Sequence, residues 1–298
     1  MSQGTIDAPI YAAGWSLGDI DWSRFDATKV TPDMLALAKA AALVEYNAAD
    51  YVGYLKRVFQ GASASTVMAF ERWGQEETQH GVALARWAEM ADPGFDFQRA
   101  FARFRAGYRP AHFDDAVSVR GSRRGEMIAR CVVECGTSSF YSALRDATEE
   151  PVLKEVAGRV AADEFRHYRL FYETMIAQDE PEPSFLRRLW VAIMRVNESD
   201  DDELAFAYYC GNVNREEERD RPYQRSAYAL AYHSKMMTLY RRHHVDRMVK
   251  MIAKAVGIDP KSKLAEWASA LLWHILMVKA GWTTSWVWTA NEPPRQAA

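Results

Sequence analysis

The chain has 298 residues, 49% of them hydrophobic, which suits one large domain or two small ones with a substantial buried core. A formal net charge of -3 offers no general attraction to nucleic acid or to an anionic membrane, so we expect neither as a partner. Three cysteines are too few for a disulfide framework and fit a reducing compartment, which predicts a cytoplasmic protein.

Residues 1–30 are predicted to form an N-terminal extension before the first helix. No basic segment is followed there by an apolar stretch, so no signal peptide is expected. Thr31 and Pro32 then supply an N-cap and a proline in the first helical turn. Glycine and proline are sparse within the long segments that follow and gather between them. The predicted helices cover about 32–60, 66–91, 123–146, 151–178, 185–197, 202–210, 225–256 and 264–279.

The order of these helices predicts an all-α fold, because strand-like alternation is nearly absent. Residues 31–180 give two helix pairs joined by a long crossover over about 94–122, which we expect to be partly helical. One long crossover is typical of a ferritin-like four-helix bundle. Residues 181–298 are expected to be additional helices packed on that bundle within the same domain. The most apolar stretch among them, 267–278, is too short and too interrupted to span a bilayer.

A short motif, Glu-x-x-His, occurs twice, at 77–80 and at 164–167. Each copy follows a further glutamate, Glu45 or Glu134, at nearly the same distance along the chain. Residues three apart on a helix project from the same side, so each pair can offer one oxygen and one nitrogen to one metal ion. Four carboxylates and two imidazoles on four helices are the ligand set of a di-metal site inside a bundle.

The residues around these glutamates favour inward-facing positions. Glu45, for example, lies in a stripe of small residues that includes Ala38, Ala41 and Ala49. Four buried carboxylates need compensating positive charge, which two divalent cations would supply. A single Glu-x-x-His is common on helices, and it is the repetition that favours metal binding. Mixed carboxylate and imidazole ligands suit iron or manganese better than structural zinc. The predicted metal ligands are Glu45, Glu77, His80, Glu134, Glu164 and His167.

An acidic residue immediately precedes the glutamate of each motif, Glu76 in the first copy and Asp163 in the second. Histidines that bind metals usually donate their other N–H to a carboxylate. In a pseudo-symmetric bundle, Asp163 would hold His80 and Glu76 would hold His167. The alternative is that both are solvent-facing charges on their helices.

Three strings stand out around the predicted ligands: Trp73-Gly-Gln-Glu-Glu-Thr-Gln-His-Gly81, Ala162-Asp-Glu-Phe-Arg-His167 and Glu134-Cys-Gly-Thr137. They resemble the soluble acyl-carrier-protein desaturases, which belong to the ferritin-like di-iron carboxylate proteins. The resemblance implies that the six predicted ligands bind two iron ions, with a manganese–iron pair as the alternative. It also implies that Thr137 lies near the oxygen-binding side and delivers protons to reduced oxygen. It covers about 31–178, and no motif after 179 carries over.

The function implied by this resemblance is an O2-dependent non-haem di-iron oxidoreductase. It would desaturate or hydroxylate an apolar, acyl-type substrate through an iron-bound peroxide. No flavin or nicotinamide fingerprint stands out in the sequence, so electrons are expected from a separate donor such as ferredoxin and its reductase. An acyl carrier protein and a second copy of the chain, in a homodimer, are further expected partners.

Two other functions compete with this one. A ferritin-like or rubrerythrin-like ferroxidase or peroxidase needs only the bundle and no organic substrate. The absence of a Cys-x-x-Cys pair from the sequence, and the long segment after residue 180, count against it. The third alternative is a non-catalytic, all-α interaction protein with a vestigial site, which metal analysis would distinguish.

Overall fold

The computed structural model describes residues 14–108, 114–198, 202–214 and 216–290, without the side chains of residues 202 and 279–290. Every regular element in these ranges is helical, which confirms the predicted all-α fold. The α-helices are α1 Pro32–Tyr46, α2 Ala48–Val58, α3 Ala64–Ala91, α4 Phe97–Gly107, α5 Arg123–Ala147, α6 Pro151–Ile176, α7 Phe185–Glu198, α8 Asp202–Asn212, α9 Arg225–Leu239, α10 Arg242–Val256 and α11 Lys263–Ala290.

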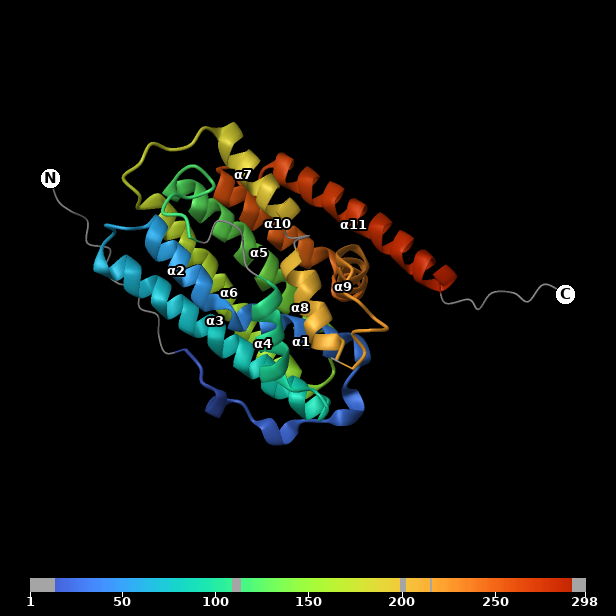
Figure 1. Ribbon diagram of the computed structural model, residues 1–298. Helices are drawn as coiled ribbons and strands as arrows, with labels where there is room; N and C mark the ends of the chain where they lie inside the picture. Colours follow the sequence, from blue (N-terminus) through green and yellow to red (C-terminus); the bar gives the residue numbers. More distant parts are fainter. Residues whose placement is uncertain (1–13, 109–113, 199–201, 215, 291–298) are drawn as a thin grey trace.

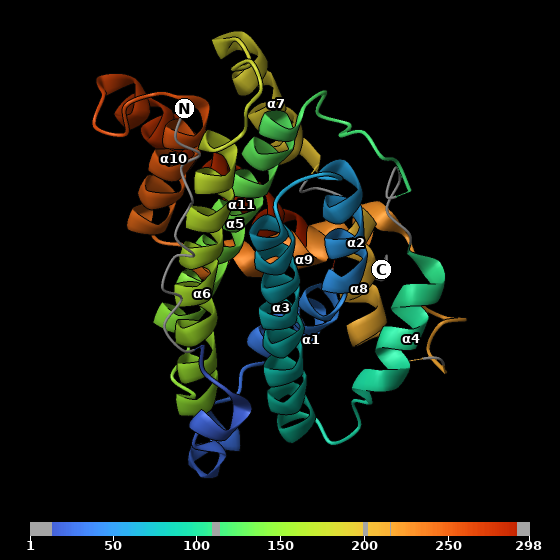
Figure 2. The ribbon, with the colours of Figure 1, turned by 90° about the vertical axis from the view of Figure 1, so that its left-hand side faces the viewer.

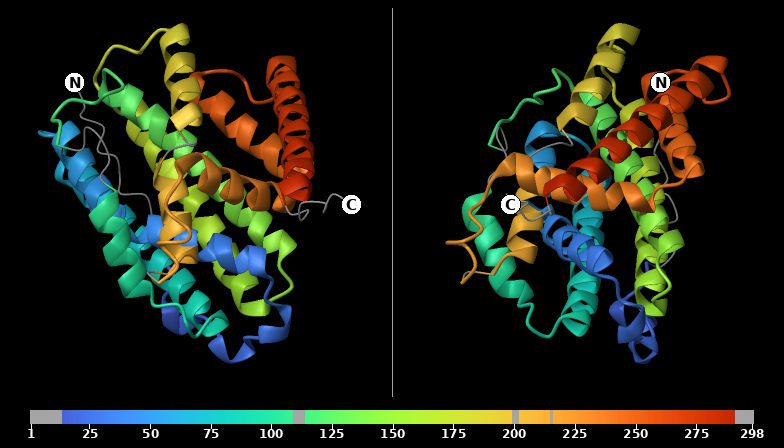
Figure 3. Two further views of the ribbon diagram at one scale, coloured as in Figure 1. Left: turned by 45° about the vertical axis from the view of Figure 1, so that its right-hand side comes forward. Right: turned by 90° about the vertical axis from the view of Figure 1, so that its right-hand side faces the viewer.

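The helices α1, α3, α5 and α6 lie at the centre of the molecule. α1 packs against α3, α5 packs against α6, and α3 packs against α6 (Figures 1 and 2). α4 lies in the connection between α3 and α5, so the predicted crossover is indeed partly helical. Of the later helices, α8 packs on α1, and α7 and α10 pack on α5. α11 packs on α9 and α10 (Figure 3).

Local sequence explains where the central helices begin. A residue before the first turn of each accepts a hydrogen bond from a backbone N–H that has no partner within the helix, which stabilises the helix start. Proline, whose fixed φ suits the first turn, follows two of these caps. The capping residues are Thr31 for α1, Ser63 for α3, Ser122 for α5 and Glu150 for α6.

Two glycines of α3 allow α1 and α2 to approach it closely. A Cβ atom on Gly81 would lie 2.6 Å from the backbone nitrogen of Tyr46, and one on Gly74 would lie 2.2 Å from Cγ2 of Val52. Both distances are far below van der Waals contact. Gly81 therefore sets the spacing between α1, which carries Glu45, and α3, which carries His80, and Gly74 sets the spacing between α2 and α3.

The predicted helix 32–60 is wrong in one respect, because it is interrupted at Asn47. This residue has φ −81° and ψ 11° and separates α1 from α2. Its side chain accepts a hydrogen bond of 2.6 Å from the guanidinium of Arg105, on α4. The residue at the helix interruption is thus held by a tertiary contact with a residue far away in the sequence.

The predicted helix 225–256 is also interrupted. Tyr240 and Arg241 adopt extended backbone conformations and separate α9 from α10. The backbone N–H of Arg241 donates to Nδ1 of His244 at 3.0 Å. The side chain of His244 therefore caps the start of a new helix instead of extending the previous one.

The described part of the N-terminal extension, residues 14–30, packs against the central helices. It contains three short 3-10 helices, Leu17–Asp19, Trp22–Arg24 and Ala27–Lys29. The guanidinium of Arg86 lies 4.2 Å from the ring centroid of Trp22, which joins this segment to α3.

The three cysteines are buried and form no disulfide, in agreement with the sequence analysis. Among the described residues, no helix has both the length and the apolar character that crossing a membrane requires.

Candidate metal centre

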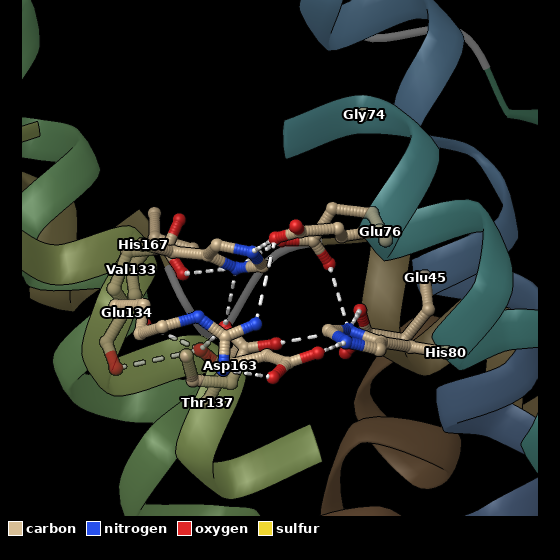
Figure 4. Close-up of polar contacts among 12 residues, drawn as sticks. Glu45, Gly74, Glu76, His80, Val133, Glu134, Thr137, Asp163 and His167 are labelled. Atoms are coloured by element: carbon tan, nitrogen blue, oxygen red, sulfur yellow. Dashed lines mark hydrogen bonds and ion pairs between the residues drawn. The ribbon is translucent and has the colours of Figure 1, made fainter. Parts of the chain in front are cut away.

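All six predicted ligands meet in the interior of the central helices (Figure 4). α1 contributes Glu45, α3 contributes Glu77 and His80, α5 contributes Glu134, and α6 contributes Glu164 and His167. Each of these side chains is buried. The repeated motif thus brings residues from four helices to one place.

The ligand atoms form two overlapping groups, in each of which the atoms lie within 4.8 Å of one another. Glu77 and Glu164 belong to both groups, so their two-oxygen carboxylates can face two positions at once. The first group is completed by Glu45 and His80, and the second by Glu134 and His167. Each group could hold a metal ion.

Both imidazoles are oriented from outside by the predicted carboxylates. Nε2 of His80 lies 2.9 Å from Oδ2 of Asp163, and Nε2 of His167 lies 2.9 Å from Oε2 of Glu76. A carboxylate only accepts hydrogen bonds, so each Nε2 carries the proton. When the ring is neutral, Nδ1 carries no proton and its lone pair is available to a metal ion. Nδ1 of His167 lies 3.0 Å from Oε1 of Glu77. These two contacts join the residues that the sequence analysis paired, Asp163 with His80 and Glu76 with His167.

Several of the inward-facing atoms are buried without a hydrogen bond to any described residue. They are Nδ1 of His80, Nδ1 of His167, both carboxylate oxygens of Glu134 and Oε1 of Glu164. Buried polar atoms normally have partners, and orphaned ones need an explanation. Metal ions at the two positions would satisfy these nitrogen and oxygen atoms together, so the residues fit such ions.

The charges in the centre favour a bound cation. Burial raises the pKa of Glu45 and of Glu134 well above the usual range, and the charges of the neighbouring Glu77 and Glu164 raise them further. Burial and the charge of Glu77 also act to raise the pKa of Glu164, but interactions with His167 and His80 outweigh them and bring it to about 2. The crowded carboxylates thus compete for protons, and divalent cations would relieve this repulsion.

The carboxylates of the centre also shift the pKa values of the two histidines. Burial alone lowers the pKa of His80, but its interactions with Asp163 and Glu164, and then with the other carboxylates, raise this pKa well above its usual value. The pKa of His167 is raised in the same way, with Glu164 and Glu76 as the largest favourable partners. In the absence of a metal ion, protons on these rings supply the positive charge that the carboxylates require.

Thr137 lies at the edge of the same centre. Its hydroxyl is 2.7 Å from Oε2 of Glu164, one of the two shared carboxylates (Figure 4). It also lies 3.4 Å from the backbone oxygen of Val133, one turn earlier on α5. The hydroxyl therefore has both a carboxylate and a backbone acceptor within reach.

Three residues that the sequence analysis did not assign to the site contact it directly. Trp15 donates from Nε1 to Oδ2 of Asp163 at 2.9 Å, and its ring stacks on His80 with an interplanar angle of 8°. Arg166 lies 2.5 Å from Oδ1 of Asp163 and 3.9 Å from Glu76, so one guanidinium serves both outer carboxylates.

Tyr141 is the third of these residues, and it donates to Oε1 of Glu45 at 2.5 Å. A signal for Tyr141 and Arg166 exists in the sequence. Tyr141 lies two turns after Glu134 on one helix face, and Arg166 lies within the second motif. No local sequence pattern predicts that Trp15 belongs to the site. It precedes the first helix and reaches the site only through the path of the N-terminal segment.

A further group of potential ligands lies outside this centre, where Asp146 approaches His243 and His244. Burial lowers the pKa of His244, so its ring is neutral at physiological pH. Its Nδ1 accepts the N–H of Arg241, so its proton is on Nε2 and points at Asp146, 3.0 Å away. His244 therefore has no lone pair to offer this group, and its ring serves to cap α10.

A scan against protein-family models finds no match for this sequence, and a search of curated proteins finds no significant similarity.

Proposed function

We propose that the protein is a ferritin-like di-iron oxidoreductase that uses O2 to desaturate or hydroxylate an apolar, acyl-type substrate. The observation that carries the proposal is the convergence of four buried carboxylates and two oriented imidazoles, with Glu77 and Glu164 common to both groups. This is the donor set of di-iron carboxylate bundles, and its hard oxygen and imidazole ligands suit iron or manganese. The long connection between α3 and α5 supports the ferritin-like topology.

When bound, two iron ions would supply the electrons that reduce O2 and the oxidising power that removes hydrogen from a C–H bond. Glu45 and His80 would hold one ion, Glu134 and His167 the other, and Glu77 and Glu164 would be shared. The protein contributes fixed ligands in a buried, water-poor interior. The resemblance of 73–81 and 162–167 to acyl-carrier-protein desaturases is the basis for the acyl-type substrate.

The protein's own groups would control protons around the metals. Asp163 and Glu76 would keep the Nε2 protons of the histidines in place, so that Nδ1 faces the metal. Thr137 would hold a proton on Oγ1, next to Glu164, and pass it to reduced oxygen. A ferredoxin-like donor would supply electrons from outside the chain.

The test is to load the protein anaerobically with iron(II), add O2 and a donor, and offer acyl chains attached to an acyl carrier protein. Mass spectrometry is expected to find products two hydrogens lighter or one oxygen heavier. A matched pair of variants on α5, Glu134→Gln in the centre and Glu126→Gln outside it, separates the site from the fold. Glu126 is also buried, but it accepts hydrogen bonds from Tyr54 and Ser118.

Loss of product in Glu134→Gln alone supports the proposal. Iron stored many-fold per chain without any organic product would replace it with the ferroxidase alternative. A wild-type protein that binds neither iron nor manganese would favour a non-catalytic role.

A further inference from the structure

The outer face of α11 is a bare row of large apolar side chains. Its members are Leu264, Trp267, Leu271, Ile275 and Val278, all of them exposed. Residues three and four apart share one face of a helix, so the row is continuous over about 20 Å. Trp267 is 76% exposed, the largest value among the exposed large hydrophobic side chains of the described ranges. Contiguous apolar surface of this kind marks an interaction site.

The inner face of α11 is apolar as well, but it is covered. Leu272, Trp273 and Leu276 pack against the hydrophobic core, and α11 contacts α9 and α10. Residues 267–278 include no Asp, Glu, Lys or Arg, so this stretch has no charged face to turn toward water. A largely apolar helix of that kind is normally buried all round. α11 instead lies at the edge of the described molecule (Figures 1 and 3), so its outer face has room for a partner.

The spacing of the row is symmetric. From Leu264 to Val278 the steps are three, four, four and three residues, so the row reads the same from either end, with Leu271 at its middle. An antiparallel copy of α11 would therefore set Leu271 against Leu271, Trp267 against Ile275, and Leu264 against Val278. Steps of three and four are also those by which the side chains of two paired helices interdigitate. A two-fold axis through Leu271 makes every one of these contacts self-complementary, as in most homodimers.

We propose that the outer face of α11 binds the same face of a second copy of this chain, antiparallel, about a two-fold axis at Leu271. The symmetric spacing is the observation that selects this occupant, because neither a different protein nor a lipid surface would require it. A helix that lies on a membrane also carries Lys and Arg along its polar face, and residues 267–278 include neither.

The row would form the apolar centre of a dimer interface. A stable dimer buries about 800 Å² on each partner, and the exposed Ala268 and His274 beside the row extend its area. No motif in the sequence assigned a surface to the expected homodimer, and this row supplies one. None of the predicted metal ligands lies on α11, so the interface can be tested apart from the proposed function.

Sedimentation velocity of the full chain, over a series of micromolar concentrations, measures dimerisation. Trp267→Glu is expected to weaken the dimer about 100-fold, as is typical when a large aromatic side chain at the centre of an interface is lost. Leu271→Glu should do the same, because two carboxylates would meet at the axis. The control is Met68→Glu, since Met68 is 66% exposed but lies on α3, on the other side of the molecule (Figure 1). Circular dichroism checks that each variant is folded.

Cysteine cross-linking tests the antiparallel geometry. The native cysteines are buried, so an introduced surface thiol is the accessible one. Leu271→Cys should form a disulfide between copies, because residues at the axis approach within the roughly 7 Å that the Cα atoms of a disulfide require. Trp267→Cys should not, because its two copies would lie eight residues, or about 12 Å, apart along the paired helices. Combining Trp267→Cys with Ile275→Cys should restore the cross-link.

A dimer that Trp267→Glu and Leu271→Glu weaken and Met68→Glu leaves intact, together with this cross-linking pattern, supports the inference. A monomeric wild type, or a dimer that both charged variants leave intact, would overturn it. So would Trp267→Cys that cross-links alone as readily as Leu271→Cys, because that result indicates a parallel pair. A monomer that binds vesicles of phosphatidylcholine and phosphatidylglycerol through Trp267 would assign the face to lipid instead. If the charged variants fail to fold, the cross-linking of Leu271→Cys and Trp267→Cys decides the question.

Discussion

At the residue scale, the centre is built from charged and polar side chains that are costly to bury and that contact one another. Four carboxylates lie where an apolar core would otherwise form, and both oxygens of Glu134 and Oε1 of Glu164 have no hydrogen-bond partner among the described residues. Two further carboxylates, Asp163 and Glu76, orient the histidines, and Arg166 approaches both of them. The site therefore has an inner layer of crowded carboxylates that bound cations would stabilise, and an outer layer in which each histidine has a carboxylate partner.

Replacing Glu134 by glutamine is predicted to stabilise the metal-free protein while it weakens metal binding. The raised pKa of Glu134 means that its ionised form is disfavoured in the folded state, and an amide is neutral at every pH. We expect a gain of about 1 kcal/mol in the free energy of unfolding, as is common when a strained functional residue is relieved. Chemical denaturation of the metal-free protein at neutral pH measures this, with Glu126→Gln as the control. A less stable Glu134→Gln would show that this carboxylate is not under strain.

The outer carboxylates are predicted to act through the histidines. Asp163→Asn and Glu76→Gln should each lower metal affinity by about 10- to 100-fold, the usual effect of losing such a partner. Calorimetric titration with manganese(II) measures the affinity. Glu71 lies on the same helix as Glu76, and its carboxylate forms an exposed ion pair with Lys56. The control variant Glu71→Gln should therefore leave the metal affinity unchanged. Equal losses in all three variants would point to a general electrostatic effect.

Metal affinity is predicted to rise with pH from acidic to neutral conditions. Glu45, Glu134, His80 and His167 all have raised pKa values in the metal-free fold, so bound protons must leave before metal can bind. The stability of the metal-free protein, in contrast, is predicted to fall as the pH rises, because of Glu45 and Glu134. Their contribution to metal-free stability is present below the ordinary value of 4.5 and is lost as the pH rises through the folded-state pKa. A metal affinity that stays constant from acidic to neutral pH would contradict this account.

At the element scale, the distance between α1 and α3 determines whether Glu45 reaches the centre. Gly81→Ala is predicted to destabilise the fold by about 1–3 kcal/mol, because the added methyl group meets the backbone of Tyr46, which cannot turn away. Gly136→Ala is the matched control. Nothing lies within 4 Å of its Cβ position, so alanine should stabilise α5 by about 0.5–1 kcal/mol. Thermal denaturation of both variants tests the pair, and equal effects would reject the steric explanation.

Helix starts could be predicted from the sequence, and helix interruptions could not. The caps Thr31 and Glu150 act on N–H groups three residues away, so local sequence specifies them. The break at Asn47 involves Arg105, which lies on a separate helix, and no periodicity of 32–60 reveals it. The same division holds for the site. The spacing of the motifs predicted which six side chains meet, whereas Trp15 reaches Asp163 only through the tertiary path of the N-terminal segment.

At the scale of the whole molecule, the segment after residue 180 is part of one packed structure. α8 packs on α1, which carries Glu45, and α10 packs on α5, which carries Glu134. α9 contacts both α5 and α8, so the helices after residue 180 pack against the helices that carry the candidate ligands and against one another.

The central claim is that six side chains from α1, α3, α5 and α6 form one site for two metal ions. Elemental analysis after anaerobic iron(II) loading, on the wild type and on Glu45→Ala and Glu134→Ala, tests it most directly. The account predicts about two iron ions per chain in the wild type, as in di-iron carboxylate bundles, and clear loss in both variants. About two ions retained in either variant, or none bound by the wild type, would contradict it.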